Sequence, residues 1–154
     1  MTILEPTIAI AADHAGYDLK QALLQQAREQ LPAIRFQDLG TDSSSKSVDY
    51  PGFAQAVCES VSSGDSQSGI LICGTGNGMV MAANRYAPTI RAALCHNQFS
   101  VQLAREHNDA NILCLGSWFV TERMSLELLK LWIHTSFHGE RHLRRIEQFS
   151  KIKS

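Results

Sequence analysis

Short apolar runs alternate with amphipathic stretches along the chain. The apolar runs cover residues 7–13, 34–40, 69–73, 89–95 and 111–116, and they predict five strands. Between them, apolar residues recur at intervals of three and four over residues 17–31, 51–63, 77–87 and 97–107, which predicts a helix after each of the first four strands. Two further helices are predicted over residues 121–137, with Thr121 as N-cap, and over residues 141–149, after Gly139.

Strands interleaved with helices are typical of one α/β domain, expected here over residues 1–154. The predicted fold is a Rossmann-like, doubly wound sandwich with a five-stranded, mainly parallel sheet. Ligands of such folds bind beyond the carboxyl ends of the strands. The residues expected at these ends are Asp13 and His14, Gly40 to Asp42, Cys73 to Thr75, Cys95 and His96, and Gly116 and Ser117. Several carry acid–base or nucleophilic groups, so this edge is the predicted site.

Composition and charge restrict the partners. Hydrophobic residues make up 44% of the chain, charged residues 19%, and the net charge is -1. These values are ordinary for a globular protein and give no reason to expect a nucleic-acid or membrane partner. Residues 138–154 carry a net charge of +3 against -4 for the rest. This basic end suits a small anion, and a solvated terminal helix is the alternative.

The four cysteines indicate neither a zinc site nor a redox pair, because they are widely spaced and no C-x-x-C occurs. No secretory signal pattern and no apolar run of membrane-spanning length is found, so a reducing, cytoplasmic setting is the default expectation. Cys58 and Cys114 are expected in the core, and Cys95 is expected to be structural. Cys73 remains available as a free thiol.

A glycine-rich loop, "GTGNG" from Gly74 to Gly78, follows the third predicted strand. A dinucleotide loop would read G-x-G-x-x-G and be followed by an acid about 20 residues later, and a phosphate loop would contain Gly-Lys-Ser/Thr. Neither pattern is present, so nucleotide binding is disfavoured. The backbone amides of such a turn can hold a small anion at a helix N-terminus. Alternatively, the glycines serve only a tight turn.

Cys73 stands directly before this loop. A helix N-terminus favours the thiolate form of a cysteine, and a thiolate can remove a proton from a carbon next to a carbonyl while amides stabilise the enediolate. A small apolar core residue is the alternative. The stretch "REHNDAN" adds His107 and Asn108, which suit proton transfer and hydroxyl binding, or else cap a helix.

Three histidines, His134, His138 and His142, recur at helical spacing and raise the question of a metal. Gly139 interrupts this helical pattern, and no nearby carboxylate completes a ligand set. We therefore expect no metal site.

Six segments together resemble one known family: "AADHAGYDLK", "DLGTDSSSKSVDYP", "GILICGTGNGMVMAANR", "IRAALC", "REHNDANILCLGS" and "GERHLRRI". The sequence is similar to ribose-5-phosphate isomerase B, in the family that includes galactose-6-phosphate isomerase subunits, over nearly the whole chain. The resemblance implies interconversion of ribose 5-phosphate and ribulose 5-phosphate through a cis-enediolate, without metal or organic cofactor. An isomerase of a hexose 6-phosphate such as allose or galactose 6-phosphate is the alternative enzyme. A catalytically silent sugar-phosphate-binding protein is the alternative of another class.

The resemblance also implies roles for individual residues. Catalysis falls to Cys73 as the base, with Thr75 beside it, and to His107 with Asp13 in opening the sugar ring. Substrate binding falls to His14, Asp49, Tyr50, Gly74, Gly76, Asn77, Gly78, Asn108, Arg141 and Arg145. Of these, His14, Arg141 and Arg145 hold the phosphate, so the helical segment at about residues 141–150 contributes to the phosphate site. A homodimer or a dimer of dimers with shared active sites is implied as well.

Two positions differ from part of that family, and the second, Trp118, is a departure from many of its members. Some members carry a glutamate base at the position of Met79, whose thioether cannot act as a base, so Cys73 is the only candidate. Many members carry a phosphate-binding arginine where this chain has Trp118. The loss of such a charge-assisted contact weakens binding by about 1.5–3 kcal/mol unless something compensates. Trp118 therefore bears on substrate identity more than on reaction type.

Overall fold

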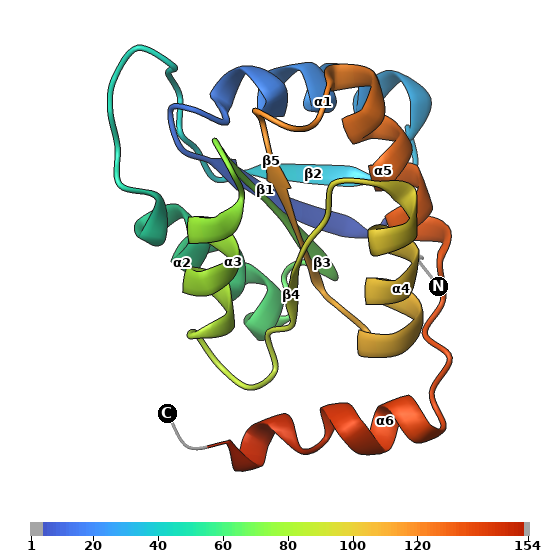
Figure 1. The fold of residues 1–154 in the computed structure, drawn as a ribbon. Helices are drawn as coiled ribbons and strands as arrows, with labels where there is room; N and C mark the ends of the chain where they lie inside the picture. The colour runs from blue at the N-terminus through green and yellow to red at the C-terminus, as the bar shows by residue number, and fades with distance from the viewer. Residues whose placement is uncertain (1–4, 153–154) are drawn as a thin grey trace.

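The computed structural model describes residues 5–152 of the predicted 1–154 domain, so Lys153 of the basic end lies outside the described residues. Five strands form one sheet in the order β2-β1-β3-β5-β4, and every neighbouring pair is parallel (Figure 1). They are β1 (Thr7–Ala12), β2 (Arg35–Asp38), β3 (Ser68–Cys73), β4 (Ala92–Leu94) and β5 (Ile112–Gly116). The predicted five-stranded α/β fold is confirmed, and the sheet is wholly parallel.

Six helices connect and follow the strands: α1 (Tyr17–Gln30), α2 (Tyr50–Ser63), α3 (Asn77–Asn84), α4 (Gln98–Asn108), α5 (Glu122–His134) and α6 (Arg141–Ile146). The connections through α1 and α4 run across the sheet in one direction, and those through α2 and α3 run in the other. Because parallel crossovers are right-handed, the two pairs cover opposite faces of the sheet (Figure 1). Among residues 5–152, no helix combines the length and apolar character needed to cross a membrane.

The core forms two clusters, one on each face of the sheet. Ile8 and Ile10 of β1 point into the cluster that contains the buried leucines of α1 and α5. Ala9 and Ala11 point into the other cluster, against α2 and α3. Side chains alternate between the faces of a strand, so one strand supplies both layers. A strand buried on both faces has apolar residues at nearly every position, which is why these runs were recognisable in the sequence.

Three helices, α3, α5 and α6, end three residues before their predicted ends. The side chain of Asn84 bonds the backbone of Ala92 at 2.8 and 3.0 Å, and α3 ends there instead of reaching residue 87. Helix α5 begins after the predicted N-cap Thr121 but ends at His134, because Thr135 adopts an extended backbone. Helix α6 covers residues 141–146, and a 3-10 helix, Phe149–Lys151, follows it. The prediction of one helix over residues 121–137 was therefore wrong at its end.

Within residues 5–152, one charged side chain is completely buried. Lys20 of α1 is 0% exposed, and its Nζ donates to the Asp38 carboxylate at 2.6 Å and to the Thr41 carbonyl at 2.7 Å. Asp38 also accepts the backbone N–H of Gly40 at 3.0 Å. A buried ammonium is tolerated only when its donors are satisfied. Lys20 thus fixes the loop that follows β2 at the carboxyl edge of the sheet.

Replacing Lys20 with Met is expected to lower the free energy of unfolding by about 2–3 kcal/mol, because Asp38 and the Thr41 carbonyl lose their partner. Urea denaturation measures the change. Lys46→Met, in the exposed loop before α2, is the matched control and should shift stability by no more than about 0.5 kcal/mol. Equal stability of Lys20→Met and the parent would contradict this role of the ammonium.

Candidate active site

The loops after β1, β3 and β5 meet at the carboxyl edge of the sheet. Asp13 donates its backbone N–H to the Ile72 carbonyl at 3.2 Å. Ser117, directly after β5, donates its backbone N–H to the Cys73 carbonyl at 2.9 Å and its hydroxyl to the Ala15 carbonyl at 2.8 Å. The strand order reverses between β1 and β3, which is where ligands of doubly wound sheets bind. Short bonds therefore hold the predicted site loops in fixed relation.

Cys73 differs from the other cysteines in its contacts. Its Sγ accepts the backbone N–H of Gly76 at 3.1 Å, at the start of α3. The thiols of Cys58 and Cys95 instead donate to backbone carbonyls. Burial raises the pKa of Cys58 to about 12 and that of Cys95 to about 11, and it raises the pKa of Cys114 well above its usual range. These three are buried core thiols as predicted, whereas the Cys73 sulfur accepts a hydrogen bond from a backbone amide at a helix N-terminus.

The three loop glycines each lie against a neighbouring side chain. A Cβ on Gly74 would come within 2.7 Å of the Trp118 ring, and one on Gly78 within 2.5 Å of the Tyr50 ring. Gly76 has a φ of 81° and faces Leu94. The sequence left a tight turn and an anion cradle open as alternatives, and the packing supplies a steric reason for each glycine. Amides of a first helical turn have no intrahelical partner, so those without another acceptor can bind an anion.

Two of the amides in this loop already have acceptors. The Gly76 amide bonds Cys73, and the Asn77 amide donates to Thr75 Oγ1 at 3.2 Å. An oxyanion that enters the loop would have to share or replace these bonds, while the amide of Gly78 in the same turn has no such acceptor within the described residues. Thr75 is half-buried, and its hydroxyl is oriented by this local contact.

His14 has a defined tautomer. Its Nδ1 accepts the backbone N–H of Val48 at 3.2 Å, so the ring proton resides on Nε2, which can donate to an anion. The carboxylate of Asp13 is 7% exposed and accepts the Gly16 N–H at 3.0 Å. Asp49 and Tyr50 lie at the start of α2 and are exposed. We call the residues at this edge the strand-end group: Asp13, His14, Asp49, Tyr50, Cys73, Gly74, Thr75, Gly76, Asn77 and Gly78.

The other predicted site residues lie at the opposite edge of the sheet. His107 and Asn108 end α4, and Arg141 and Arg145 lie on α6, which packs against α4 (Figure 1). We call these four residues the α4–α6 group. The carbonyl of Asn111, just after α4, accepts the N–H of Gly69 at the start of β3. Gly69 and Cys73 are four residues apart on β3, so about 13 Å of strand separates the end of α4 from Cys73.

One chain therefore does not bring the two groups together. The sheet and its helices fill the space between the edges, so a small ligand at Cys73 contacts neither His107 nor the arginines of the same chain. The expectation that His14, Arg141 and Arg145 bind one phosphate is likewise not met within a single chain.

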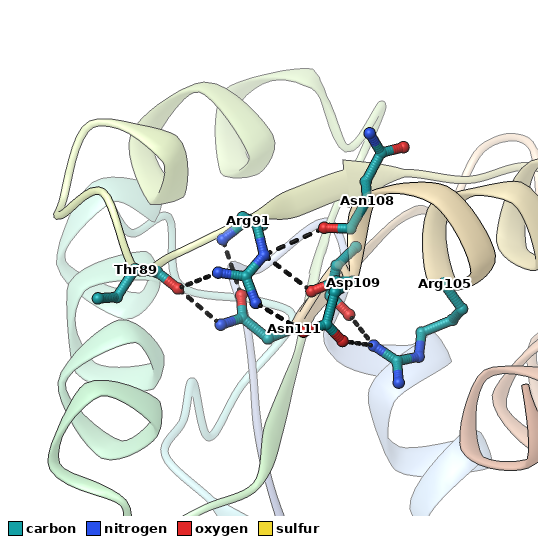
Figure 2. A network of polar contacts seen from close by, with 7 residues as sticks. Thr89, Arg91, Arg105, Asn108, Asp109 and Asn111 are labelled. Carbon is teal, nitrogen blue, oxygen red and sulfur yellow. Dashed lines mark hydrogen bonds and ion pairs between the residues drawn. The ribbon is translucent and has the colours of Figure 1, made fainter. Parts of the chain in front are cut away.

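The turn that carries Asn108 is held by a polar network that sequence reasoning missed (Figure 2). Arg91, just before β4, donates to the carbonyls of Asn108 and Asp109 at 3.1 and 2.9 Å and to the Asp109 carboxylate at 3.2 Å. Arg105 donates to the same carboxylate at 3.1 Å. Asp109 has a φ of 43°, a conformation that aspartate tolerates better than most residues. Arg91 lies in an apolar predicted strand, and such a charge is the signal that would have indicated an acidic partner.

The histidines at helical spacing do not cluster as a helix would place them. His134 ends α5, where its Nδ1 contacts the Lys130 carbonyl at 2.7 Å. His107 takes its place beside the other two, and its ring stacks on that of His142 with centroids 4.2 Å apart. Burial, followed by the charges of His107, Arg141, Arg145 and His138, lowers the pKa of His142.

A hollow of about 1340 Å³ lies between the α3–β4 connection and the C-terminal segment. Its lining includes the apolar residues Tyr86, Phe149 and Ile152, the charged residues Arg85 and Lys151, and Asn108 of the α4–α6 group. Ile152 is 71% exposed there. The hollow is away from Cys73, and its apolar walls lack a partner within residues 5–152.

Comparison with known proteins gives a consistent result. The family model described as Ribose/Galactose Isomerase matches residues 8–149. Ribose-5-phosphate isomerase B of Escherichia coli is 38% identical over 146 residues, which cover 95% of each chain. A solved ribose 5-phosphate isomerase from Thermotoga maritima has a TM-score of 0.91 and 41% identity over 97% of this chain and 100% of that one. Ribose-5-Phosphate Isomerase B of Clostridium thermocellum gives 0.89 and 41%, covering 94% of this chain and 95% of that one. The predicted isomerase activity class is confirmed, and the chain belongs to the ribose/galactose isomerase family.

Proposed function

We propose that this protein interconverts ribose 5-phosphate and ribulose 5-phosphate through a cis-enediolate. The observation that carries the proposal is the Cys73 sulfur, which ends β3, accepts an amide N–H at the start of α3 and lies beside the loops after β1 and β5. Members of the same family with 38–41% identity are named for this substrate. A binding protein would need the anion contacts but would have no use for a base.

Cys73 is the proposed base. As a thiolate it removes the proton from C2 of the open-chain aldose, which gives the enediolate. The hydroxyl proton then moves from O2 to O1, and the thiol returns its proton to C1 as C2 becomes the carbonyl carbon. The proton travels on sulfur, and no redox partner is needed. Amides of the glycine loop, with the Thr75 hydroxyl, stabilise the negative oxygen that develops. The side chains of Asp49 and Tyr50 are exposed next to this loop, where they suit contact with sugar hydroxyls.

Ring opening and phosphate binding fall to groups from both edges. Asp13 and His107 are proposed to move the protons that open the furanose ring, and Asn108 is proposed to bind a hydroxyl. His14 Nε2–H, Arg141 and Arg145 are proposed to hold the phosphate. Both arginines are exposed on α6, so their guanidinium groups are available to an anion.

A second copy of the chain is required to complete such a site. Because the strand-end group and the α4–α6 group lie at opposite edges of one chain, each active site must take one group from each of two copies. The hollow between the α3–β4 connection and the C-terminal segment supports this homodimer, since a partner seated there covers the apolar side chains of Tyr86, Phe149 and Ile152. The hollow also adjoins Asn108, so a partner would arrive beside the α4–α6 group.

A hexose 6-phosphate is the second candidate substrate. The observation that favours it is Trp118, at a position where many members of the family carry an arginine. Its side chain is 72% exposed, and its ring lies against Gly74. A flat apolar ring at this point offers a surface for a sugar ring in place of a charge for a phosphate.

Replacing Cys73 with Ala is expected to reduce kcat for ribose 5-phosphate by about 10²–10⁴-fold, because the proton acceptor is lost, while KM changes little. A coupled assay of ribulose 5-phosphate formation measures both. Cys95→Ala removes another buried thiol at the same sheet edge and should retain activity. Full turnover by Cys73→Ala would rule out the base, and a larger kcat/KM for allose 6-phosphate than for ribose 5-phosphate would favour the second substrate.

Iodoacetamide at pH 8 is expected to label Cys73 before the other three cysteines in the folded protein. A thiol whose pKa is about 11 has about one thiolate in a thousand molecules at pH 8, and one whose pKa is about 12 has fewer. Because burial raises these pKa values, labelling of Cys58, Cys95 and Cys114 should require strongly alkaline pH or unfolding. Peptide mass spectrometry measures the order in which the four cysteines are alkylated. Labelling of Cys95 as fast as Cys73 would contradict the proposal that Cys73 acts as the thiolate base.

Shared sites are tested by mixing inactive variants. Cys73→Ala and His107→Ala chains, unfolded and refolded together, should recover about a quarter of the parent activity, because half of the dimers are mixed and each has one intact site. The control pair, Cys73→Ala with Asp13→Asn, carries both changes in the strand-end group and should recover nothing. Equal recovery by both pairs, or by neither, would contradict a site built from two chains.

A further inference from the structure

Three imidazoles gather where α4 ends and α6 begins. One nitrogen from each of His107, His138 and His142 lies within 4.8 Å of one nitrogen from each of the other two. The backbone makes this possible, because the N–H of His138 donates to the Glu106 carbonyl at 3.0 Å and draws the segment after α5 onto α4. In sequence, two of the histidines are four residues apart and the third is distant, a spacing that recurs in nitrogen-rich metal sites.

A second observation points to a ligand at this position. The side chain of His142 is almost completely buried, and its Nε2 has no hydrogen-bond partner within the described residues. A buried polar atom without a partner costs about 1–3 kcal/mol, so a ligand that satisfies it gains affinity.

We propose that His107, His138 and His142 form a binding site for a divalent transition-metal ion of the zinc class, and that its occupancy inhibits the isomerase by withdrawing His107. The inhibition, unlike the binding, rests on the proposed role of His107 in ring opening. Zinc bonds imidazole nitrogen at about 2.0–2.1 Å with tetrahedral angles, which places two such nitrogens about 3.4 Å apart. The three nitrogens therefore need to approach by at most about 1.4 Å.

The side chains are able to make this movement. His138 is 56% exposed, so its ring can turn inward without displacing core residues. The rings of His107 and His142 are nearly parallel, at 9°, and must tilt before both lone pairs point at one ion. Zinc, copper and nickel suit three imidazoles, whereas magnesium and calcium require oxygen ligands and are not expected to bind.

Charged side chains around the three histidines affect their affinity for a metal ion. The Glu106 carboxylate lies 3.7 Å from His138 Nε2 and is 17% exposed, so it can orient that ring or take the fourth position. Arg141 and Arg145 weaken metal binding, because their positive charges repel a cation near His142. A moderate affinity is expected, and a phosphate bound to the arginines would remove part of this repulsion.

Calorimetric titration of zinc chloride into chelator-treated Cys73→Ser protein tests the binding, because this background removes the thiolate that would compete for zinc. One ion per chain is expected, with affinity at least tenfold lower when His138→Ala is added. His134→Ala removes a histidine outside the cluster and should bind as the background does. No saturable binding, or equal affinity with and without His138, would overturn the site.

Activity measurements then test the inhibition. With Cys73 intact, zinc should inhibit isomerisation, and His138→Ala should need at least tenfold more zinc for the same loss. If both proteins respond equally although the calorimetry shows the site, inhibition through His107 is refuted. Metal-free protein that does not isomerise either sugar phosphate would contradict the proposed function alone and leave the metal site standing.

Discussion

The parallel sheet with right-handed crossovers is the constraint on which the arrangement of the site depends. Each connecting helix returns the chain from the carboxyl edge of the sheet to the opposite edge. A residue that follows a strand and a residue that ends a helix therefore lie at opposite edges. Cys73 ends β3, and His107 is in the last turn of α4, so the fold itself separates the proposed base from the proposed ring-opening group. No change of side-chain rotamer within one chain can undo a separation that the backbone imposes.

The same constraint gives the strand-end loops their order. Because all five strands point one way, the loops after β1, β3 and β5 emerge side by side, and Ser117 bonds to both of the others. The buried ammonium of Lys20 adds the loop after β2 to this set by holding the Thr41 carbonyl. The edge is thus held by polar contacts that are themselves buried. Such contacts define one geometry more narrowly than apolar packing does, because an unmatched donor or acceptor is costly.

The sequence was informative where the signal is local and periodic. Apolar strands and the helical spacing of leucines identified the elements, since a strand buried on both faces and an amphipathic helix have different periods. The edge at which Asp13 and Cys73 lie followed from strand polarity alone. The end of α5 did not follow, because the apolar spacing continues to Phe137 while the backbone becomes extended at Thr135. The Arg91–Asp109 network joins residues 18 apart on different elements, and no local pattern encodes such a pair.

The histidines also show what a local sequence pattern cannot predict. Helical spacing grouped His134 with His138 and His142, whereas the fold replaces it with His107 from a different helix. Spacing along one segment identifies neighbours only if that segment stays helical, and this one ends at His134. Helical spacing thus identified two of the three clustered histidines, but it included His134 in place of His107.

Trp118 and the glycine loop have to be considered together. Gly74 has no room for a side chain because the indole of Trp118 lies against it, so the residue that stands in place of a phosphate-binding arginine also restricts the loop. An arginine there would add a positive charge within reach of the Cys73 site. With an indole, the charge for a phosphate must come from elsewhere, and in this chain the exposed guanidinium groups of Arg141 and Arg145 lie at the other edge of the sheet. Phosphate affinity in this protein should therefore depend on assembly more strongly than in relatives that keep the arginine, because the indole leaves His14 as the one phosphate-binding group proposed on the Cys73 side.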